Sequence, residues 1–432
     1  MLEAACSRPA LRDCGRPDPS ATLKPAPFTL GRRASFWVSA GVVAHTLWTS
    51  AAPAMAYRLY AQEWHLSHTV TTGIFAVYPI VVVAVLVGFG GISDHIGRRA
   101  TMLIGLGASL AGALLFAVAP NVLWLFAGRA LMGVGVGLTA GPSTAAVVEF
   151  GTGGPLKRAA LITTVAQAAG FAAALLLGGA LIEYAPWPRR LTFWVLAALL
   201  TLLFAATWLL PRCTGGDGGR WRLRAPSVPR DARKAFAVAS LAMMTAYSHG
   251  VLVLSLGGQV AHDLVGSPNA FVNGAVLSLF AIVSGMVGIV ARSLPARTAM
   301  TLGALGSTTG MGLLAMAVAR HHLPAFLLAT STAGAGYSLL FLSALEVINR
   351  AAPTHHRGGV LSALYLLAYL SMGTVALVLG AVATARGLDL AVDLGAGAIA
   401  ALSLATLVLA ASMGGLPLRS SSPAPRGASA NS

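Results

Sequence analysis

The sequence predicts an all-α integral membrane protein with twelve transmembrane helices arranged as two pseudo-symmetric six-helix bundles. The first indication is composition, because 56% of the 432 residues are hydrophobic and only 10% are charged. A soluble protein of this length needs many more charges to cover its surface. The second indication is a series of long apolar runs, and the third is one polar gap that divides these runs six and six.

A helix needs about 20 apolar residues to cross the hydrocarbon core of a bilayer. Six runs of this kind precede the polar gap, over 35–57, 70–92, 99–119, 122–148, 159–183 and 190–210. The gap reads "PRCTGGDGGRWRLRAPSVPRDARK" and is the longest hydrophilic stretch between them. Six further runs follow it, over 235–262, 270–291, 298–319, 323–347, 358–384 and 389–414.

The two ends of the chain are rich in proline, serine and basic residues, a composition typical of disordered tails. The first segment also lacks the apolar core and cleavage site of a signal peptide. The expected organisation is a cytoplasmic tail at 1–33, a bundle at 34–211, a basic cytoplasmic linker at 212–234, a second bundle at 235–415 and a tail at 416–432.

The distribution of positive charge predicts the orientation. With the N-terminus in the cytoplasm, 23 of the 29 lysines and arginines lie on the cytoplasmic side and five lie outside. Such a bias favours cytoplasmic termini. We therefore expect a multi-pass protein of the bacterial inner (plasma) membrane. The net charge of +16 is then explained by topology and by anionic lipid headgroups, and not by binding to nucleic acid.

The two halves carry matching segments. Gly137 precedes Glu149 by twelve residues in the fourth run, and Gly334 precedes Glu346 by the same spacing in the tenth. "GRRATMLIGLG" after the second run is echoed by "PARTAMTLGALG" after the eighth, without an acid before it. Two six-helix halves related by duplication are a plan used by secondary transporters.

The polar stretch "GGISDHIGRR" lies between the second and third runs, on the side expected to be cytoplasmic. Gly90, Asp94, Gly97, Arg98 and Arg99 in it resemble the signature loop of the major facilitator superfamily of transporters, and "GRALMGVGVG" (128–137) resembles the second motif of that family. The resemblance implies the twelve-helix fold of this family over about residues 35–414.

Two positions depart from the family pattern. His95 stands where the family usually has arginine or lysine. Drug antiporters of the family often carry a Gly-Pro-rich motif in helix 5, whereas "LITTVAQAAGFAAALLLGGAL" has glycines but no proline.

The resemblance also implies a gating role for the loop. It places Asp94 against the start of helix 11, near Gly358, where a carboxylate meets the positive end of a helix. Arg98 or Arg99 can reach Glu149 at the same side of helix 4. Together these contacts would latch the two halves closed on the inside. The alternative is a tight basic turn that only sets topology.

Three further residues in the spans are candidates for transport or proton coupling: His45, Arg129 and His249. Arg129 either binds an anionic group or tunes a proton site, or else braces helix 1 through its backbone carbonyls. His45 and His249 occupy helices 1 and 7, which are counterparts in the two halves, and each either carries a proton or is a neutral structural histidine. No acid lies near the middle of a span. Coupling therefore runs through histidine, through Glu149 or Glu346, or does not occur.

Several polar or aromatic residues are candidates for lining the substrate cavity, although each has a structural alternative: Trp48, Gln167, Tyr247, Tyr337, Tyr365 and Tyr369. Tyr365 and Tyr369 are four apart and so share one face of a helix. An aromatic cavity with few charges suits amphipathic or neutral organic molecules.

These features predict a secondary active transporter that exports small organic or amphipathic molecules by alternating access, by proton-coupled antiport. The alternative is an uptake symporter or facilitator for a small metabolite. We expect a monomer in the lipid bilayer, with a small-molecule substrate and protons as partners and with no cofactor and no metal. We expect no enzymatic activity, because the adjacent pairs His321–His322 and His355–His356 lack the spacing of ligand pairs and no acid cluster accompanies them. A receptor would carry an output domain, and the longest loop has about 25 residues.

Overall fold

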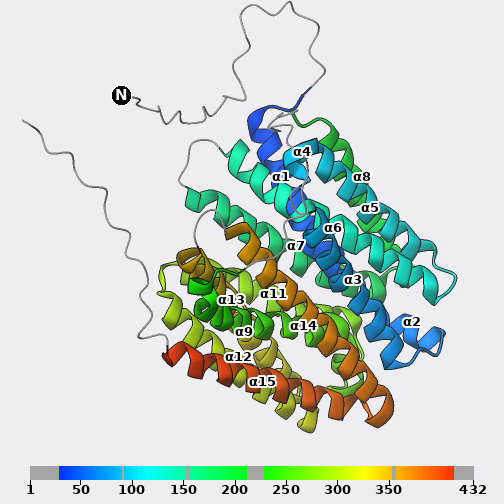
Figure 1. Cartoon of the computed structure of the whole chain (residues 1–432). Helices are drawn as coiled ribbons and strands as arrows, with labels where there is room; N and C mark the ends of the chain where they lie inside the picture. Colours follow the sequence, from blue (N-terminus) through cyan, green and yellow to red (C-terminus); the bar gives the residue numbers. More distant parts are fainter. Residues whose placement is uncertain (1–28, 90–91, 152–155, 212–227, 353–356, 413–432) are drawn as a thin grey trace, which may run out of the picture.

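Long apolar runs fold into helices because a helix satisfies all its backbone hydrogen bonds internally, which a bilayer demands. The computed structural model describes residues 29–89, 92–151, 156–211, 228–352 and 357–412, and these residues are almost entirely helical. Figure 1 shows the helices side by side in one bundle-like body.

The first half of the chain forms the helices α1 (Arg32–Ala51), α2 (Tyr57–Glu63), α3 (His68–Phe89), α4 (Ser93–Ile96), α5 (Arg98–Val118), α6 (Val122–Phe150), α7 (Leu156–Tyr184) and α8 (Leu191–Trp208). The second half forms η1 (Arg230–Ala232), α9 (Arg233–Gly250), η2 (Val251–Ser255), α10 (Gly257–Gln259), η3 (Val260–Leu264), α11 (Ala270–Val290), η4 (Ala291–Ser293), α12 (Ala296–Arg320), α13 (Leu323–Ala351), α14 (Arg357–Arg386) and α15 (Leu388–Ser412). We call the two ends of the body the α2 end and the α4 end, after the short helices that mark them.

Eleven helical stretches within the described residues are long and apolar enough to cross a membrane. α1 is not among them, because its serine, threonine and histidine side chains lower its mean hydropathy. It nevertheless packs lengthwise against α6 and α7, as a spanning helix does. With α1, the described part of the chain contains twelve long helices, in the order that the sequence predicts.

The helix contacts repeat between the two halves. In the first half α5 packs on α6 and α8, α1 packs on α6 and α7, and α3 packs on α6. The equivalent helices of the second half make the same pairs: α12 with α13 and α15, α9 with α13 and α14, and α11 with α13. The halves meet mainly through α7 with α11 and α3 with α14 (Figure 1). This pattern is the pseudo-symmetry that the matching sequence segments indicate.

Glycines permit the closest approaches between the halves. A Cβ added at Gly179 of α7 would lie 2.5 Å from the carbonyl oxygen of Ala270, and one at Gly274 of α11 would lie 2.4 Å from that of Leu175. Any larger side chain would force these helices apart. Small residues serve this purpose in membrane helix packing, where no hydrophobic effect drives the helices together.

Helix 1 is shorter than the sequence predicts. The expected range is 35–57, but α1 ends at Ala51 and the separate helix α2 begins at Tyr57. Pro53 has no N–H to continue the helical ladder, so the chain turns between the two helices. The short α2 then lies across the end of the bundle.

Helix 7 is interrupted where the sequence predicts a continuous run over 235–262. α9 is followed by two π-helical segments, η2 and η3, with the single turn α10 between them. π-turns widen a helix locally and are frequent at functional sites. The sequence there, "VLVLSLGGQVAHDL", is apolar enough to conceal this break.

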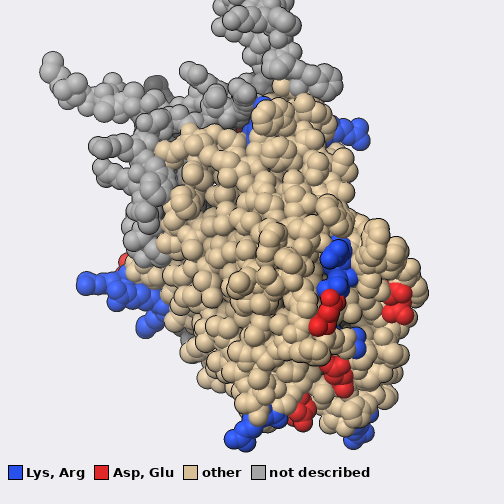
Figure 2. Space-filling view, turned by 90° about the vertical axis from the view of Figure 1, so that its right-hand side faces the viewer, with Lys and Arg blue, Asp and Glu red and all other residues tan. Residues whose placement is uncertain are grey.

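The outer surface is that of a membrane protein. Figure 2 shows a face on which most of the visible atoms are uncharged, with Lys, Arg, Asp and Glu side chains in small groups. Large apolar side chains are exposed on the long helices, including Leu202, Val290 and Val408. In water such exposure would favour aggregation, whereas in a bilayer it contacts lipid.

Candidate functional site

The signature loop forms a single helical turn followed by a sharp reversal. α4 ends at Ile96 and is followed by Gly97, whose φ of 86° is accessible to glycine at little cost. α5 begins directly afterwards, so Arg98 projects from its first turn. The Arg98 guanidinium forms an ion pair with Glu149 at the end of α6, and its Nη1 lies 3.4 Å from the carbonyl oxygen of Ala145.

Arg99 has different partners. Its Nη1 donates to the carbonyl oxygen of Leu210 at 3.0 Å, and its guanidinium carbon lies 5.6 Å from the centre of the Trp208 ring. Both partners lie at the end of α8 or just after it. The two arginines therefore brace α5 against α6 and α8, within the first half of the chain.

Two members of the signature loop are not fully described. Gly90 lies outside the described residues, and so does the side chain of Asp94, although its backbone belongs to α4. The expected contact between Asp94 and the start of helix 11 therefore stays a prediction. The Arg98–Glu149 pair by itself joins helices of one half and does not bridge the two halves.

Arg129 is completely buried in α6. Its Nη1 donates to the carbonyl oxygen of Ser50 in α1 at 3.1 Å. Its guanidinium carbon lies 4.7 Å from the ring centre of Tyr78, 5.6 Å from Phe75 and 6.0 Å from Tyr57. The faces of these rings attract the cation where water cannot reach it.

The ring environment of Arg129 extends to α2. Burial raises the pKa of the Tyr57 hydroxyl to about 12, against the opposing effect of the Arg129 guanidinium. Tyr57 therefore stays neutral beside the cation at physiological pH. The sequence leaves a functional and a structural role open for Arg129. The hydrogen bond to Ser50 matches the structural role, a brace to a backbone carbonyl of helix 1.

His45 and His249 are both buried, but their surroundings differ. The Nδ1 of His45 bonds to the carbonyl oxygen of Val42 in its own helix, and its Nε2 has no hydrogen-bond partner among the described residues. The Nδ1 of His249 lies 2.9 Å from the carbonyl oxygen of Thr245, and its Nε2 lies 3.1 Å from the Ser307 hydroxyl of α12. The Ser307 hydroxyl in turn lies 2.7 Å from that of Ser403 in α15.

The four predicted cavity tyrosines come together with two phenylalanines, and we call this set the tyrosine cluster: Tyr247 of α9, Phe280 of α11, Tyr337 and Phe341 of α13, and Tyr365 and Tyr369 of α14. Tyr247 is central, with its ring centre 4.9 Å from Tyr369 and 6.5 Å from Tyr365. Phe171 of α7 contacts Phe280 from the first half, with ring centres 6.0 Å apart. The cluster thus reaches the junction of the two halves.

The other two cavity candidates lie elsewhere. Trp48 is half-buried and packs on the main hydrophobic core, and Gln167 is half-buried on α7. Among the described ring contacts, none joins Trp48 to the tyrosine cluster. The structure therefore groups four of the six predicted cavity residues.

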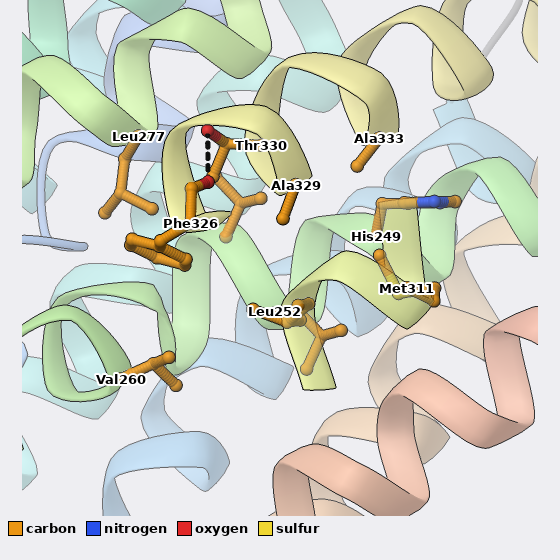
Figure 3. A pocket seen from close by; sticks show the side chains of 11 residues that line it. His249, Leu252, Val260, Leu277, Met311, Phe326, Ala329, Thr330 and Ala333 are labelled. Carbon is orange, nitrogen blue, oxygen red and sulfur yellow. Dashed lines mark hydrogen bonds between the residues drawn. The ribbon is translucent and has the colours of Figure 1, made fainter. Parts of the chain in front are cut away.

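A small pocket of about 20 Å³ lies inside the second half (Figure 3). Its lining is mostly apolar and includes Leu252 and Val253 of η2, Val260 of η3, Met311 of α12 and Phe326 of α13. His249 also borders it. The pocket has room for about one water-sized molecule, and we refer to it as the void beside the π-turns.

Polar contacts at the α2 end join the two halves, and the sequence does not predict them. His68 Nδ1 lies 3.0 Å from Gln259 Oε1, and the Thr69 hydroxyl lies 2.9 Å from that of Thr384. Arg58 of α2 contacts His262 and Asp263 of η3. These pairs are about 190 to 315 residues apart in sequence, so spacing gives no signal for them.

Within the described residues no group of three or more His, Cys, Asp or Glu side chains is arranged to hold a metal ion. The acids near helix ends have other partners. Glu346 pairs with Arg350 one turn along α13, and Glu183 Oε2 accepts from the Ala270 N–H at the start of α11. The candidate site therefore consists of buried aromatic and polar side chains. The Arg98–Glu149 pair lies toward the α4 end, and the polar contacts between the halves lie at the α2 end.

The chain matches the model of the Major Facilitator Superfamily over residues 37–376. It is 33% identical over 168 residues to the multidrug efflux pump LfrA of Mycolicibacterium smegmatis (strain ATCC 700084 / mc(2)155), a stretch that covers 38% of this chain and 33% of that pump. The match thus spans about a third of that relative.

Solved transporters share the fold at low sequence identity. The nucleoside transporter NupG superposes with a TM-score of 0.67 and 12% identity, over 88% of this chain and 98% of that one. The peptide transporter POT, in complex with sulfate, gives a TM-score of 0.72 and 15% identity, over 89% of this chain and 95% of that one. The twelve long helices, the repeated contacts of the two halves and the family match lead to one conclusion: the chain belongs to the Major Facilitator Superfamily of membrane transporters.

Proposed function

We propose that this transporter exports small aromatic or amphipathic organic molecules by alternating access, coupled to proton antiport. The two six-helix halves would move as units around a site near their junction, with the linker over 212–234 between them. The bacterial inner membrane is the proposed location, with both termini in the cytoplasm, and the proposed working form is a monomer.

The tyrosine cluster carries this proposal. Its rings present apolar faces and hydroxyl groups, and Phe171 extends it across the junction to the first half. The six members of the tyrosine cluster are tyrosines and phenylalanines, and none of them is charged. Such a surface stacks on flat organic molecules and attracts organic cations through the ring faces.

The proposed direction has one support. The partial relative is described as a multidrug efflux pump, although it covers only part of this chain. The signature loop, with Arg98 paired to Glu149 near the α4 end, would form part of the inner gate together with Asp94.

Of the two buried histidines, His45 is the better candidate for carrying a proton in the span. Its Nδ1 donates to the Val42 carbonyl oxygen, so the Nε2 of the neutral ring has a lone pair with no partner among the described residues, whereas both nitrogens of His249 have partners. A coupling group must accept and release a proton without dismantling the bundle. In this proposal His249 is a structural residue of the second half, and Arg129 fixes helix 1 near its end, at Ser50.

The direct test is transport by purified protein in proteoliposomes with an imposed pH gradient, using a panel of flat cationic and neutral dyes. Antiport predicts dye movement opposite to the proton flux and its loss when the gradient is collapsed. Dye movement in the same direction as protons would establish the uptake symporter instead. Transport indifferent to the gradient would reject proton coupling.

The tyrosine cluster is tested by Tyr247→Leu. Loss of its ring contacts should raise KM for aromatic substrates about two- to tenfold, since an aromatic pair contributes about 0.5–1.5 kcal/mol. Tyr247→Phe is the matched control, because it keeps the ring and should change KM little. An unchanged KM in Tyr247→Leu would remove the cluster from the substrate site.

A further inference from the structure

The α2 end is closed by a histidine that lies between an arginine and an aspartate. Arg58 Nη2 is 2.8 Å from His262 Nε2, and His262 Nδ1 is 2.7 Å from Asp263 Oδ1. Arg58 Nε also lies 3.6 Å from the same Asp263 oxygen. We propose that these three residues form a lock between the halves, and that His262 Nε2 is a proton-binding site whose occupation opens the lock.

The donor and acceptor roles in the lock follow from chemistry. A guanidinium can only donate hydrogen bonds, so His262 Nε2 must accept and must be unprotonated. The proton of the neutral ring then lies on Nδ1 and is donated to Asp263. The closed lock therefore requires a neutral His262.

A proton arriving from water would take the Nε2 lone pair that Arg58 now uses. The hydrogen bond between Arg58 and His262 would be lost. An N–H of the imidazolium would then face an N–H of the guanidinium, and both groups would be positively charged. The imidazolium would also bind Asp263 more strongly through Nδ1, which weakens the attraction between Asp263 and Arg58. Both effects favour separation. Histidine is the side chain that titrates between about pH 5 and 8.

Arg58 is presented by a fixed element. The Tyr60 hydroxyl in α2 lies 3.1 Å from the carbonyl oxygen of Phe116, and Glu63 pairs with Arg189 Nε at 2.7 Å. Burial raises the pKa of Tyr60, so its hydroxyl remains a donor. Both contacts are within the first half of the chain. α2 therefore belongs to the first half and carries Arg58 with it.

His262 and Asp263, in contrast, lie on the interrupted part of helix 7. They belong to the π-helical segment η3, and η2 lies shortly before it. π-turns are rare interruptions of α-helices and are frequent at functional sites. The void of Figure 3 borders Leu252, Val253 and Val260 on these same segments, so they have space beside them.

The lock is accessible to water. The side chains of Arg58, His262 and Asp263 are 23%, 30% and 44% exposed. Partial exposure lets a proton reach His262 from water, and partial burial limits the screening of the charges by solvent.

Other titratable groups lie on the elements around η3. They include Glu63 of α2 (paired with Arg189), His68 of α3, and His321 after α12 (bonded to the Leu264 carbonyl). α2 also carries Tyr57 and Tyr60, α12 ends in Arg320, and Asp389 and Asp393 are exposed on α15. Within the described residues, α11 carries no charged side chain. Within the described residues, the polar partners of the His262 ring are Arg58 and Asp263.

His68 provides an internal contrast. Its Nδ1 faces the Gln259 side-chain oxygen, so this nitrogen donates whether the ring is neutral or charged. Protonation would preserve that bond. Of the two histidines that contact the other half here, only His262 loses its partner on protonation.

In this proposal, a lower pH on the α2 side opens the lock on that side. In the proposed topology this is the outside of the cell, so an inward proton gradient would bias the transporter toward its outward-open state. The inference needs only that the protein alternates between two states. It does not rest on the proposed substrate or on the direction of transport.

The test measures conformation and needs no substrate. Spin labels are attached to cysteines introduced at the exposed Gln62 of α2 and Pro268, after η3, in a protein lacking Cys6, Cys14 and Cys213. Distances are measured in lipid nanodiscs between about pH 8 and about pH 5. We expect a longer-distance population to grow as the pH falls.

His262→Gln should remove this shift, because glutamine can accept from Arg58 but cannot become a cation. Arg58→Gln should show the longer distance already at high pH. His68→Gln and the exposed His65→Gln are matched controls that should retain the shift. Retention of the full shift in His262→Gln, or a distance in the unsubstituted labelled protein that does not change with pH, would overturn the proposal. Because no transport is measured, either result is independent of the efflux proposal.

Discussion

At the scale of single residues, the buried polar groups differ in how many of their hydrogen-bonding atoms already have a partner. His249 is tied through Ser307 to Ser403, which joins three helices of the second half. Arg129 is enclosed by aromatic rings and bonded to helix 1. Of the two histidines, only His45 keeps a ring nitrogen without a partner among the described residues. Equivalent helices of the two halves therefore carry histidines with unequal chemistry.

The two histidines should respond differently to substitution. Under the proposed proton coupling, His45→Gln abolishes gradient-driven transport but preserves substrate exchange without a gradient, because glutamine fits the site and cannot carry the proton. His249→Phe should instead lower stability by about 0.5–1.5 kcal/mol, since it removes the buried hydrogen bond between the ring and the Ser307 hydroxyl. Transport assays and thermal unfolding in detergent separate the two outcomes.

The control for this pair is Ser284→Ala, which removes only a bond of the hydroxyl to a carbonyl of its own helix. It should leave both stability and coupling nearly unchanged. Normal gradient-driven transport by His45→Gln would exclude His45 as the proton carrier.

At the scale of helices, close contacts through glycine set how the halves fit together. A Cβ at Gly380 of α14 would fall 1.8 Å from the Thr72 hydroxyl oxygen of α3, closer than any real contact. α3 and α14 form one of the two main interfaces between the halves. Their packing therefore depends on the absence of a single side chain.

Gly380→Val should push α3 and α14 apart and destabilise the protein by about 1–3 kcal/mol, the usual cost of overpacking. The shift is measured as a lower unfolding temperature in detergent, together with slower transport. Gly312→Val is the control, because a Cβ there meets nothing within 4 Å. Equal stability of the two variants would contradict the close approach of these helices.

At the scale of the whole molecule, the described polar contacts between the halves lie at the α2 end, whereas the signature-loop pair at the α4 end stays within one half. Arg98 reaches across from α5 to Glu149 of α6, but the equivalent acid Glu346 pairs with Arg350 in its own helix. The duplication has thus kept the acids and changed their partners.

Reversing the Arg98–Glu149 pair tests whether it serves gating. Arg98→Glu and Glu149→Arg should each slow turnover, because each places like charges together, and the double substitution should restore most of the rate. Since Arg98 is 42% and Glu149 27% exposed, the pair itself contributes only about 0–1 kcal/mol to stability. The effect is therefore sought in transport rates. Reversal of the Glu346–Arg350 pair is the control and should leave turnover near normal.

The class of this protein and the order of its long helices follow from the sequence without a structure. Apolar length decides which segments can span a bilayer, and this property is local, so it can be read along the chain. The signature-loop residues and the tyrosines could also be found this way, because a polar or aromatic residue stands out in an apolar run. Pro53 could have marked the end of α1, but apolar residues around it concealed the break.

Which of these residues meet depends on the tertiary structure. Arg58 and His262 are 204 residues apart, and no periodicity relates them. The same holds for Ser307 and Ser403, and for Phe171 and Phe280, whose contacts arise only when helices from distant parts of the chain pack together. The division has a physical reason: the bilayer selects helices one segment at a time, whereas a lock or a binding site depends on the approach of separate helices.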